Sequence, residues 1–455
     1  MAKYQAYPEY KDSGVEWLGD VPNHWKTIAI SRLFSRIKRT GYSEKKLLSV
    51  YRDYGVIPKS SRDDNNNKPS EDLSPYQLVR SNDLVMNKMK AWQGSIAISE
   101  YEGIVSPAYF VYQPNKALFE QAHPRYVHYL LRNPIYVTQY LSRSKGIRVN
   151  QWDLDPDEFG KIELLLPTKY EQETIYSFLD HETAKIDNLI EKQQQLIELL
   201  KEKRQAVISH AVTKGLNPDV PMKDSGVEWL EEVPEHWSVC RLKQIIKSGS
   251  SISYGIVQPG DSLDDGIPFI QTTNVSQGNI GRESLQKTSE RIEQNYPRSR
   301  LEGGEVILGI RASIGSAYVV PLELKGVNLS RGVARIQPGV NITSAYLVWY
   351  FKTNAVEQYW ALSKQGSTFS EVSIETVREL VVCIPPKDEQ QYISSCLENS
   401  LDKIHKLIVT SEKQMSFLIE RRTALISAAV TGKIDVRNWV APEAEKAEVS
   451  QEATA

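Results

Sequence analysis

The chain has 455 residues, enough for two or three domains that each bury a hydrophobic core. Apolar residues make up 40% and charged residues 25% of it, as in ordinary soluble proteins, and no run of about 18 apolar residues predicts a membrane span. The N-terminus lacks the apolar core of a signal peptide, and Cys240, Cys383 and Cys396 show no metal-ligand spacing. We therefore expect a cytoplasmic protein without a zinc site.

The sequence opens with a phrase that it later repeats. "KDSGVEWLGDVPNHW" runs from Lys11 to Trp25, and "KDSGVEWLEEVPEHW" runs from Lys223 to Trp237. An internal repeat of this kind predicts two structural units of the same design. A tryptophan-bearing phrase placed once in each unit is expected to pack where a variable domain meets a scaffold, with the tryptophans in the core.

Each phrase is followed by a variable domain. The segment from Asn82, "NDLVMNKMKAWQGSIAI", resembles "GEVILGIRASIGSAYVV" from Gly304, and the segment from Tyr126 resembles the one from Tyr346. Short apolar runs bounded by glycine predict strands, and the tyrosine-rich segments have helical spacing. Each variable domain is therefore predicted to be α+β. Net charge is only −2, but residues 26–100 hold 14 Lys/Arg and 8 Asp/Glu. This count fits a basic domain within a neutral chain, and it equally fits a surplus of cations spread over a solvated surface.

Two long helices complete the repeat. After the prolines that open "PTKYEQETI" (from Pro167) and "PPKDEQQYI" (from Pro385), the chain continues each time for about 45 residues without glycine or proline, and both stretches end in "AVT". Apolar residues recur about every seven positions, as in coiled coils. The residues predicted to pair the two helices are Ile186, Leu189, Ile190, Leu196, Ile197, Leu200, Val207, Ile404, Leu407, Ile408, Met415, Leu418 and Leu425.

Chain order predicts how these parts are arranged. Because domain termini usually lie close together, the second helix should return alongside the first, antiparallel to it. The predicted fold is α+β, with two pseudo-twofold-related variable domains separated by a pair of long antiparallel helices. The predicted segments are the first phrase (1–25), first variable domain (26–166), first long helix (167–215), second phrase (216–237), second variable domain (238–384), second long helix (385–438) and a disordered acidic tail (439–455).

Catalytic motifs are missing from the sequence. It has no P-loop, dinucleotide fingerprint, paired histidines or nucleophile elbow. "NPIY" at Asn133 differs from the Asn-Pro-Pro-Tyr motif of amino-methyltransferases, and "DPDEFGK" at Asp155 is absent from the second half, so neither is interpreted as a site. We predict that the chain is not an enzyme and binds no cofactor.

Binding remains, and duplex DNA suits two similar domains held apart, because half-sites about one turn apart present the same groove. Arg can bind guanine, Asn and Gln can bind adenine, and Lys, Ser and Thr can hold phosphates. The candidate DNA-binding residues are Lys88, Lys90, Trp92, Gln93, Arg143, Lys145, Arg148, Asn150, Gln151, Gln271, Thr272, Thr273, Asn274, Arg311, Lys364, Gln365 and Thr368.

The duplicated phrase and helix starts resemble the specificity subunit of Type I restriction-modification systems over nearly the whole chain. The resemblance implies a bacterial or archaeal protein with two target recognition domains, each reading half of a split, asymmetric DNA site. It implies helices that set the spacer and dock two methyltransferase subunits, which bring S-adenosylmethionine and methylate adenine N6. It also implies restriction subunits, with a motor and nuclease that use ATP and Mg²⁺.

Two alternatives stay open. A stand-alone bipartite DNA-binding regulator would need the same recognition domains. A coiled-coil adaptor that binds protein at both ends would have no DNA affinity, so steep salt dependence of DNA binding would argue against it. Leu189, Leu196, Ile197 and Leu199 widen the apolar face of the first long helix beyond a two-helix seam, which favours docking of partner subunits.

Overall fold

The structure is a computed structural model that describes residues 4–52, 54–62, 68–148, 151–363 and 371–441. The chain forms two compact units. The first unit combines Met1–Gln193 with Gln414–Ala455, and the second consists of Gln194–Lys413. Residues 414–441 therefore belong to the same unit as the first variable domain.

The repeated phrase forms the same hairpin in both units. In the first unit β1 (Tyr10–Asp12) pairs antiparallel with β2 (Asp20–Pro22), and in the second β15 (Met222–Asp224) pairs with β16 (Glu232–Pro234). The registers are equivalent, with Lys11 opposite Val21 and Lys223 opposite Val233. The phrase thus encodes one local structure twice.

The variable domain of the first unit is built on a four-stranded antiparallel sheet. Its order is β4 (Phe34–Ile37), β11 (Tyr109–Pro114), β8 (Leu84–Asn87), β9 (Ile96–Ile98). Two-stranded ladders join β3 (Lys26–Ala29) with β14 (Glu163–Leu166), β5 (Leu48–Tyr51) with β6 (Gly55–Pro58), β7 (Gln77–Val79) with β10 (Gly103–Val105), and β12 (Ser144–Arg148) with β13 (Gln151–Leu154). The helical segments are α1 (Ile30–Leu33), η1 (Lys59–Ser61), η2 (Ala91–Gln93), α2 (Lys116–Gln121), α3 (Pro124–Leu131), α4 (Pro134–Arg143) and α5 (Pro156–Gly160).

The second unit keeps this plan and adds to it. Its sheet has the matching order β18 (Ser253–Tyr254), β24 (Val333–Ile336), β21 (Val306–Gly309), β22 (Ala317–Val319), and β17 (Ser238–Arg241) pairs with β25 (Val381–Ile384). A further sheet of order β20 (Gln286–Thr288), β19 (Ile267–Ile270), β23 (Asn328–Leu329) includes a parallel pair, β19 with β23. The helices are η3 (Leu242–Gln244), α7 (Thr272–Gln277), η4 (Arg282–Ser284), α8 (Glu290–Glu293), η5 (Pro297–Ser299), η6 (Leu322–Leu324), α9 (Ser344–Phe351), α10 (Asn354–Ser363) and α11 (Ile374–Glu379).

The long helices are α6 (Lys169–Thr213) and α12 (Lys387–Val430). In the first unit the start of α6 lies beside the end of α12, because Asp187 binds Arg422 at 2.7 Å and Phe178 shares a core with Val430. In the second unit the end of α6 packs with the start of α12, through residues such as Leu200 and Ile404. The two helices are therefore antiparallel, and the predicted α+β chain with a duplicated recognition domain and two long helices is confirmed.

The residues predicted to pair the helices divide into three groups. Ile186, Ile197, Leu200, Ile404 and Ile408 are buried, and Ile190, Val207, Met415, Leu418 and Leu425 are half-buried. Leu189, Leu196 and Leu407 are exposed. Counted from Ile186, Gln193 and Ile404, the exposed leucines lie three residues further along the helix, whereas the buried or half-buried Ile190, Ile197 and Ile408 lie four residues further along. The buried stripe therefore follows an i, i+4, i+7 pattern, and these three leucines lie on its outer flank.

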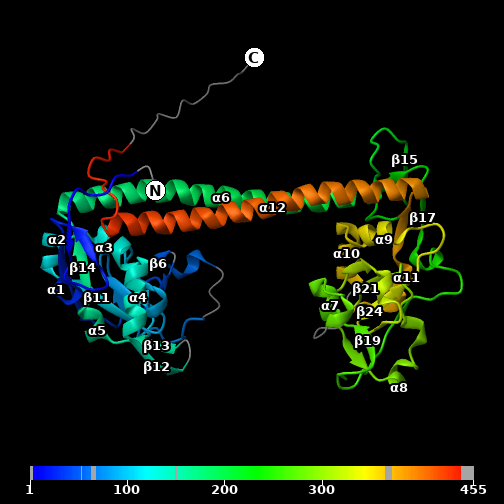
Figure 1. Cartoon of the computed structure of the whole chain (residues 1–455), viewed down its shortest axis with the longest axis horizontal. Helices are drawn as coiled ribbons and strands as arrows, with labels where there is room; N and C mark the ends of the chain where they lie inside the picture. Colours follow the sequence, from blue (N-terminus) through cyan, green and yellow to red (C-terminus); the bar gives the residue numbers. More distant parts are fainter. Residues whose placement is uncertain (1–3, 53, 63–67, 149–150, 364–370, 442–455) are drawn as a thin grey trace, which may run out of the picture. The chain divides into compact units, whose positions relative to one another are not determined.

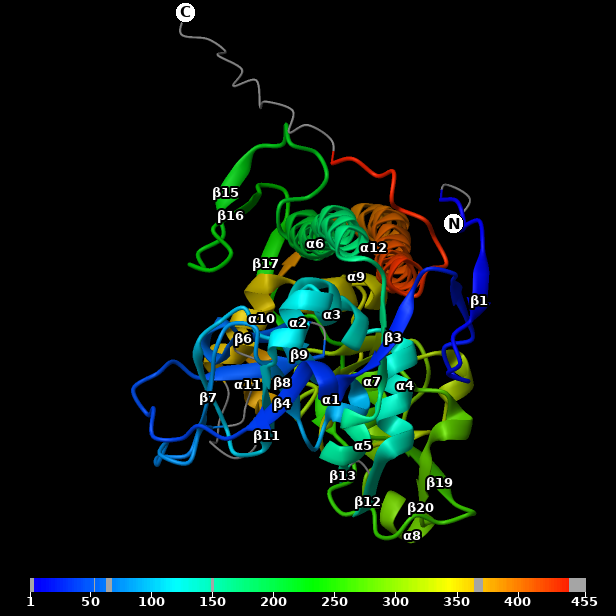
Figure 2. The ribbon, with the colours of Figure 1, turned by 90° about the vertical axis from the view of Figure 1, so that its left-hand side faces the viewer.

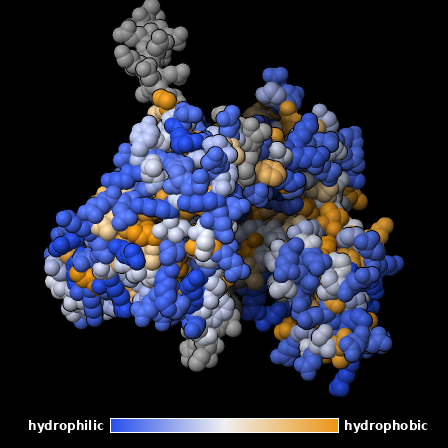
Figure 3. Space-filling model, turned by 60° about the vertical axis from the view of Figure 1, so that its left-hand side comes forward, coloured by the Kyte–Doolittle hydropathy of each residue, from blue (hydrophilic) through white to orange (hydrophobic). Residues whose placement is uncertain are grey.

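Hydrophobic packing joins sheet, helices and scaffold within each unit. In the first unit α3 and α4 lie on the sheet (Figures 1 and 2). One core contains side chains from β8, β9, α3, α4, α6 and α12. The face drawn in Figure 3 is mostly hydrophilic, with hydrophobic residues in small groups. Among the described residues, no helix is both long and apolar enough to pass through a lipid bilayer.

Candidate nucleic-acid interface

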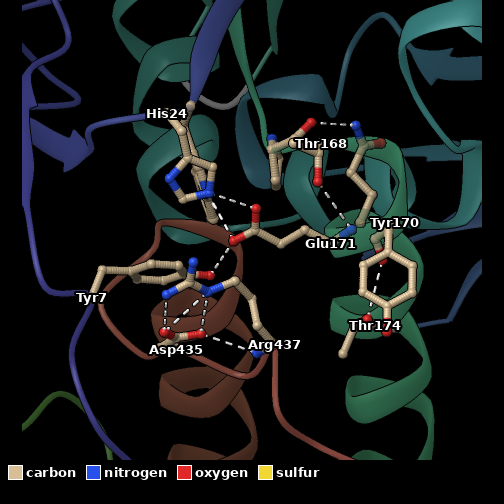
Figure 4. Close-up of polar contacts among 11 residues, drawn as sticks. Tyr7, His24, Thr168, Tyr170, Glu171, Thr174, Asp435 and Arg437 are labelled. Carbon is tan, nitrogen blue, oxygen red and sulfur yellow. Dashed lines mark hydrogen bonds and ion pairs between the residues drawn. The ribbon is translucent and has the colours of Figure 1, made fainter.

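A buried glutamate fixes the repeated phrase to the first turn of α6. Glu171 is 2% exposed and accepts hydrogen bonds from the Tyr7 hydroxyl (2.5 Å), Trp25 Nε1 (3.0 Å) and His24 Nε2 (2.8 Å). Figure 4 shows the Tyr7 and His24 side chains converging on this carboxylate. Burial and the bond to Glu171 raise the pKa of Tyr7 well above its usual value, so the phenol stays a donor. Tyr7 and the phrase residues His24 and Trp25 therefore supply the donors, and the helix supplies the acceptor.

The second unit repeats this arrangement with fewer contacts. Glu389 accepts from Trp237 Nε1 at 3.2 Å and from His236 Nε2 at 2.8 Å, and its side chain is 28% exposed. The first unit also adds a C-terminal cation to this junction: Arg437 Cζ lies 5.0 Å from the centroid of the Tyr7 ring, and Asp435 forms an ion pair with Arg437 at 2.6 Å (Figure 4). Trp25 and Trp237 are fully buried, as predicted for the phrase tryptophans, whereas Trp17 and Trp229 are half-buried and pack against the core of their unit.

The glutamine that follows each glutamate fastens the recognition domain to the helix start. Gln172 accepts from the His123 amide (2.8 Å) and donates to the carbonyls of Gln121 (3.1 Å) and Pro167 (2.9 Å). Gln390 accepts from the Thr343 amide (2.8 Å) and donates to Asn341 (2.8 Å) and Pro385 (2.9 Å). Both glutamines are fully buried. Each "EQ" pair thus orients a variable domain on the scaffold.

The first unit brings two of the predicted DNA-binding segments together. Lys88, Lys90, Trp92 and Gln93 lie between β8 and β9, and Trp92 packs on Trp152 of β13 with ring centroids 4.9 Å apart. Lys90 and Gln93 are exposed, and Lys88 and Trp92 are half-buried. Arg143 bonds to the Gln139 side chain and backbone, while Lys145 is exposed on β12. The turn between β8 and β9 therefore lies against the β12–β13 hairpin. Together they carry the lysines, Gln93 and Trp92 of the predicted DNA-binding set.

Arginines and amides gather in the second unit as well. Gln271, Thr272, Thr273 and Asn274 follow β19, and Asn274 Oδ1 accepts from the Gln271 amide at 2.9 Å. Arg311 follows β21, and both Thr272 and Arg311 lie against Gly332. A Cβ added to Gly332 would lie 2.3 Å from Thr272 Cγ2 and 3.4 Å from Arg311 Cβ. Glu371 lies 3.9 Å from Arg311 and 3.3 Å from Arg331. Arg331 is not among the residues predicted from the sequence, where its signal is the Arg-Gly pair that follows β23.

Asn150, Lys364, Gln365 and Thr368 lie outside the described residues, as does the predicted tail from residue 442. Arg148 and Gln151 are paired across the β12–β13 ladder by their backbones.

The two sequence motifs that were set aside are helix caps. Asn133 of "NPIY" is buried and accepts from the Ile135 amide at 2.9 Å at the start of α4. Asp155 of "DPDEFGK" accepts from the amides of Asp157 and Glu158 at the start of α5. Both side chains thus serve the backbone.

A family model described as the Type I restriction modification DNA specificity domain matches residues 22–199 and again residues 234–413. The chain is 28% identical over 329 residues to the Type I restriction enzyme EcoBI specificity subunit of Escherichia coli, covering 70% of this chain and 66%, just under two thirds, of that protein. It is 23% identical over 431 residues to the MjaVIII specificity subunit of Methanocaldococcus jannaschii, covering 92% and 95%.

Solved structures share the fold. A chain from a study of complex assembly and conformational transition of the type I R-M system aligns over 90% of this chain and 98% of its own length, with a TM-score of 0.66 and 16% identity. The HsdS subunit from Thermoanaerobacter tengcongensis aligns over 91% and 98%, with a TM-score of 0.52 and 17% identity. Since the family model covers both halves and well over half of the residues, this chain belongs to the family of Type I restriction-modification DNA specificity subunits.

Proposed function

We propose that the chain reads a bipartite, asymmetric DNA site, with one half-site contacted by each recognition domain. The supporting observation is a duplicated scaffold that carries different side chains at the same place. Both units hold a sheet of the same strand order and the same Glu–His–Trp contact. The turn after the third strand, however, presents Lys88 and Lys90 in one unit and Arg311 in the other. Different donors at equivalent positions suit two different half-sites.

The long helices are proposed to set the spacer and to dock two methyltransferase subunits. Leu189, Leu196 and Leu199 are exposed on α6, and about 100° per residue places them within roughly 80° of one another around the helix. A stripe of exposed leucines is costly in water and suits a protein partner. The bound methyltransferase would supply S-adenosylmethionine for adenine N6 methylation, and restriction subunits would supply ATP- and Mg²⁺-dependent cleavage. The chain is the non-catalytic specificity component.

A methylation map tests this function. The chain is co-expressed with the methyltransferase encoded beside its gene, and host DNA is sequenced by a method that detects N6-methyladenine. A new split motif that disappears when the chain is omitted is the expected result. A regulator or an adaptor would give no new methylation and no stable complex with the methyltransferase.

The adaptor alternative is tested separately by DNA binding. A specificity subunit binds duplex DNA with an affinity that falls steeply with salt, because its cations displace counterions from phosphates. An adaptor has no such affinity.

A further inference from the structure

A basic cleft lies between the recognition domain and the end of α12 in the first unit. It has a volume of about 300 Å³ and is lined by three arginines, Arg52, Arg132 and Arg422, together with neutral residues that include Gly94 and Ile426. None of its lining residues is acidic. Arg422 is held by Asp187, and Arg132 donates to the Arg52 carbonyl at 2.7 Å. The cleft therefore has fixed cationic walls.

The second unit has an equivalent cleft. Its volume is about 460 Å³, and its lining includes Lys201, Arg204 and Lys352, with Glu357 as its one acid. Lys352 directly follows α9, as Arg132 directly follows α3, and Arg204 lies four residues before Ile208, as Arg422 lies four before Ile426. The positive character of the cleft thus recurs at matching positions although the residue types differ.

Two observations show that the second cleft is suited to an anion. Trp360 Nε1 lies in the cleft wall, is buried, and has no hydrogen-bond partner within the part of the chain that the structure describes. An indole N–H can only donate. In addition, burial and the neighbouring Arg204 lower the pKa of Lys352, as expected where cations lie close together. An anion bound here would accept from Trp360 and relieve the repulsion between Lys352 and Arg204.

Each cleft adjoins the turn that carries candidate DNA contacts. Gly94, which lines the first cleft, directly follows Gln93. Gly315, which lines the second, lies four residues after Arg311. Both glycines have positive φ, 91° and 87°, which lets the backbone turn from the exposed tip into the cleft wall. DNA on the turn would thus bring its sugar-phosphate backbone toward the cleft.

We propose that the two clefts are phosphate-binding sites for the backbone of duplex DNA, and that they add affinity without reading sequence. This inference rests on the proposed DNA-recognition function and goes beyond it, because it assigns a sequence-independent contact to residues outside the candidate base-reading sets. An acidic segment of a protein partner is the competing occupant. DNA is favoured because the clefts occur once per recognition domain, next to the candidate base-reading turns.

The test measures how the salt dependence of DNA binding changes. The full chain is titrated with a labelled duplex that contains its methylated motif and with an unrelated duplex, between about 50 and about 200 mM salt. Each phosphate contact contributes about 0.9 to the slope of log affinity against log salt. Arg132→Gln and Lys352→Gln should each reduce that slope by about one, and the double variant by about two, equally for both duplexes.

Matched variants keep the result interpretable. Arg52→Gln removes a cation from the first cleft but keeps the Arg52 carbonyl that Arg132 contacts. Arg204→Gln removes a cation from the second cleft and leaves the buried Trp360 in place. These two variants replace Arg132→Gln and Lys352→Gln in the test if those are unstable. Lys406→Gln is the control, because Lys406 is an exposed cation on α12 that binds Asp402 at 2.7 Å, and its slope should match that of the unsubstituted chain. Thermal unfolding verifies that each variant is folded.

Several outcomes would overturn the inference. If the cleft variants fold and keep the original salt slope, the clefts do not bind phosphate. If DNA affinity falls only for the target duplex, these residues contact bases. Unchanged DNA binding with loss of the methyltransferase complex would assign the clefts to an acidic protein segment. If the unsubstituted chain bound neither duplex, the DNA-recognition function would fail together with the inference. If the unsubstituted chain binds DNA and the cleft variants bind it equally well, only the phosphate-site inference is rejected and the DNA-recognition function stands.

Discussion

Removing the carboxylate of Glu171 should destabilise the junction of the first unit far more than removing Glu389 destabilises that of the second. Glu171→Ala leaves two buried donors, the Tyr7 hydroxyl and the Trp25 indole, without an acceptor. A buried donor left unsatisfied costs about 1–3 kcal/mol, so the expected loss is about 2–6 kcal/mol. His24 is partly exposed and can turn to water.

The second copy provides the matched control. Glu389→Ala leaves one buried donor, the Trp237 indole, and the partly exposed carboxylate position admits water. Its loss should therefore be about 1 kcal/mol. Glu171→Gln is the conservative variant, because a Gln oxygen can still accept from Tyr7 and Trp25 while its amide donates to His24 Nε2. Its expected loss is about 1 kcal/mol or less.

Hydrogen exchange followed by mass spectrometry measures these losses separately in each unit, since it reports local opening. Amide protection in residues 169–179 should fall at least about thirtyfold in Glu171→Ala, because about 1.4 kcal/mol corresponds to a factor of ten. Protection in residues 387–397 should fall less than tenfold in Glu389→Ala. Equal losses in the two variants would refute the reasoning that burial and the number of donors set the strength of each junction.

Three further expectations concern the same framework. Gly432→Ala should lower the free energy of unfolding, measured by urea unfolding, more than Gly215→Ala does. Both glycines have positive φ, but a Cβ at Gly432 would lie 2.5 Å from Pro22, whereas a Cβ at Gly215 would have no atom closer than 3.4 Å. Equal losses in the two variants would contradict this reasoning. Burial and the adjacent Arg132 lower the pKa of His128 to about 3, below its unfolded value of about 6.5, so the folded state loses up to about 1.4 kcal/mol per pH unit as pH falls through that window. His128→Gln should lack this part of the pH dependence in unfolding measured between about pH 7 and about pH 5. Replacing residues 26–166, from β3 to the end of β14, with the corresponding domain of a relative should change one half of the methylated motif; a change in both halves would reject separate reading.

The sequence itself determined the repeated architecture. The phrase ending in Trp25 and Trp237, the "EQ" pairs and the glycine-free long helices are local signals that fold in the same way in both halves, since capping, helix periodicity and hairpin turns depend on neighbouring residues. The same signals indicated that the phrase tryptophans lie in the core, where the structure places Trp25 and Trp237, while Trp17 and Trp229 pack half-buried against it.

Only the tertiary structure decided which distant residues meet. The sequence could not show that Tyr7 joins the Glu171 cluster, or that the helix seam follows Ile190 and Ile197 rather than Leu189 and Leu196. The basic clefts are of the same kind, because each combines side chains more than a hundred residues apart in the chain. Long-range packing sets such contacts, and the spacing of residues along one segment carries no record of what another segment brings to it.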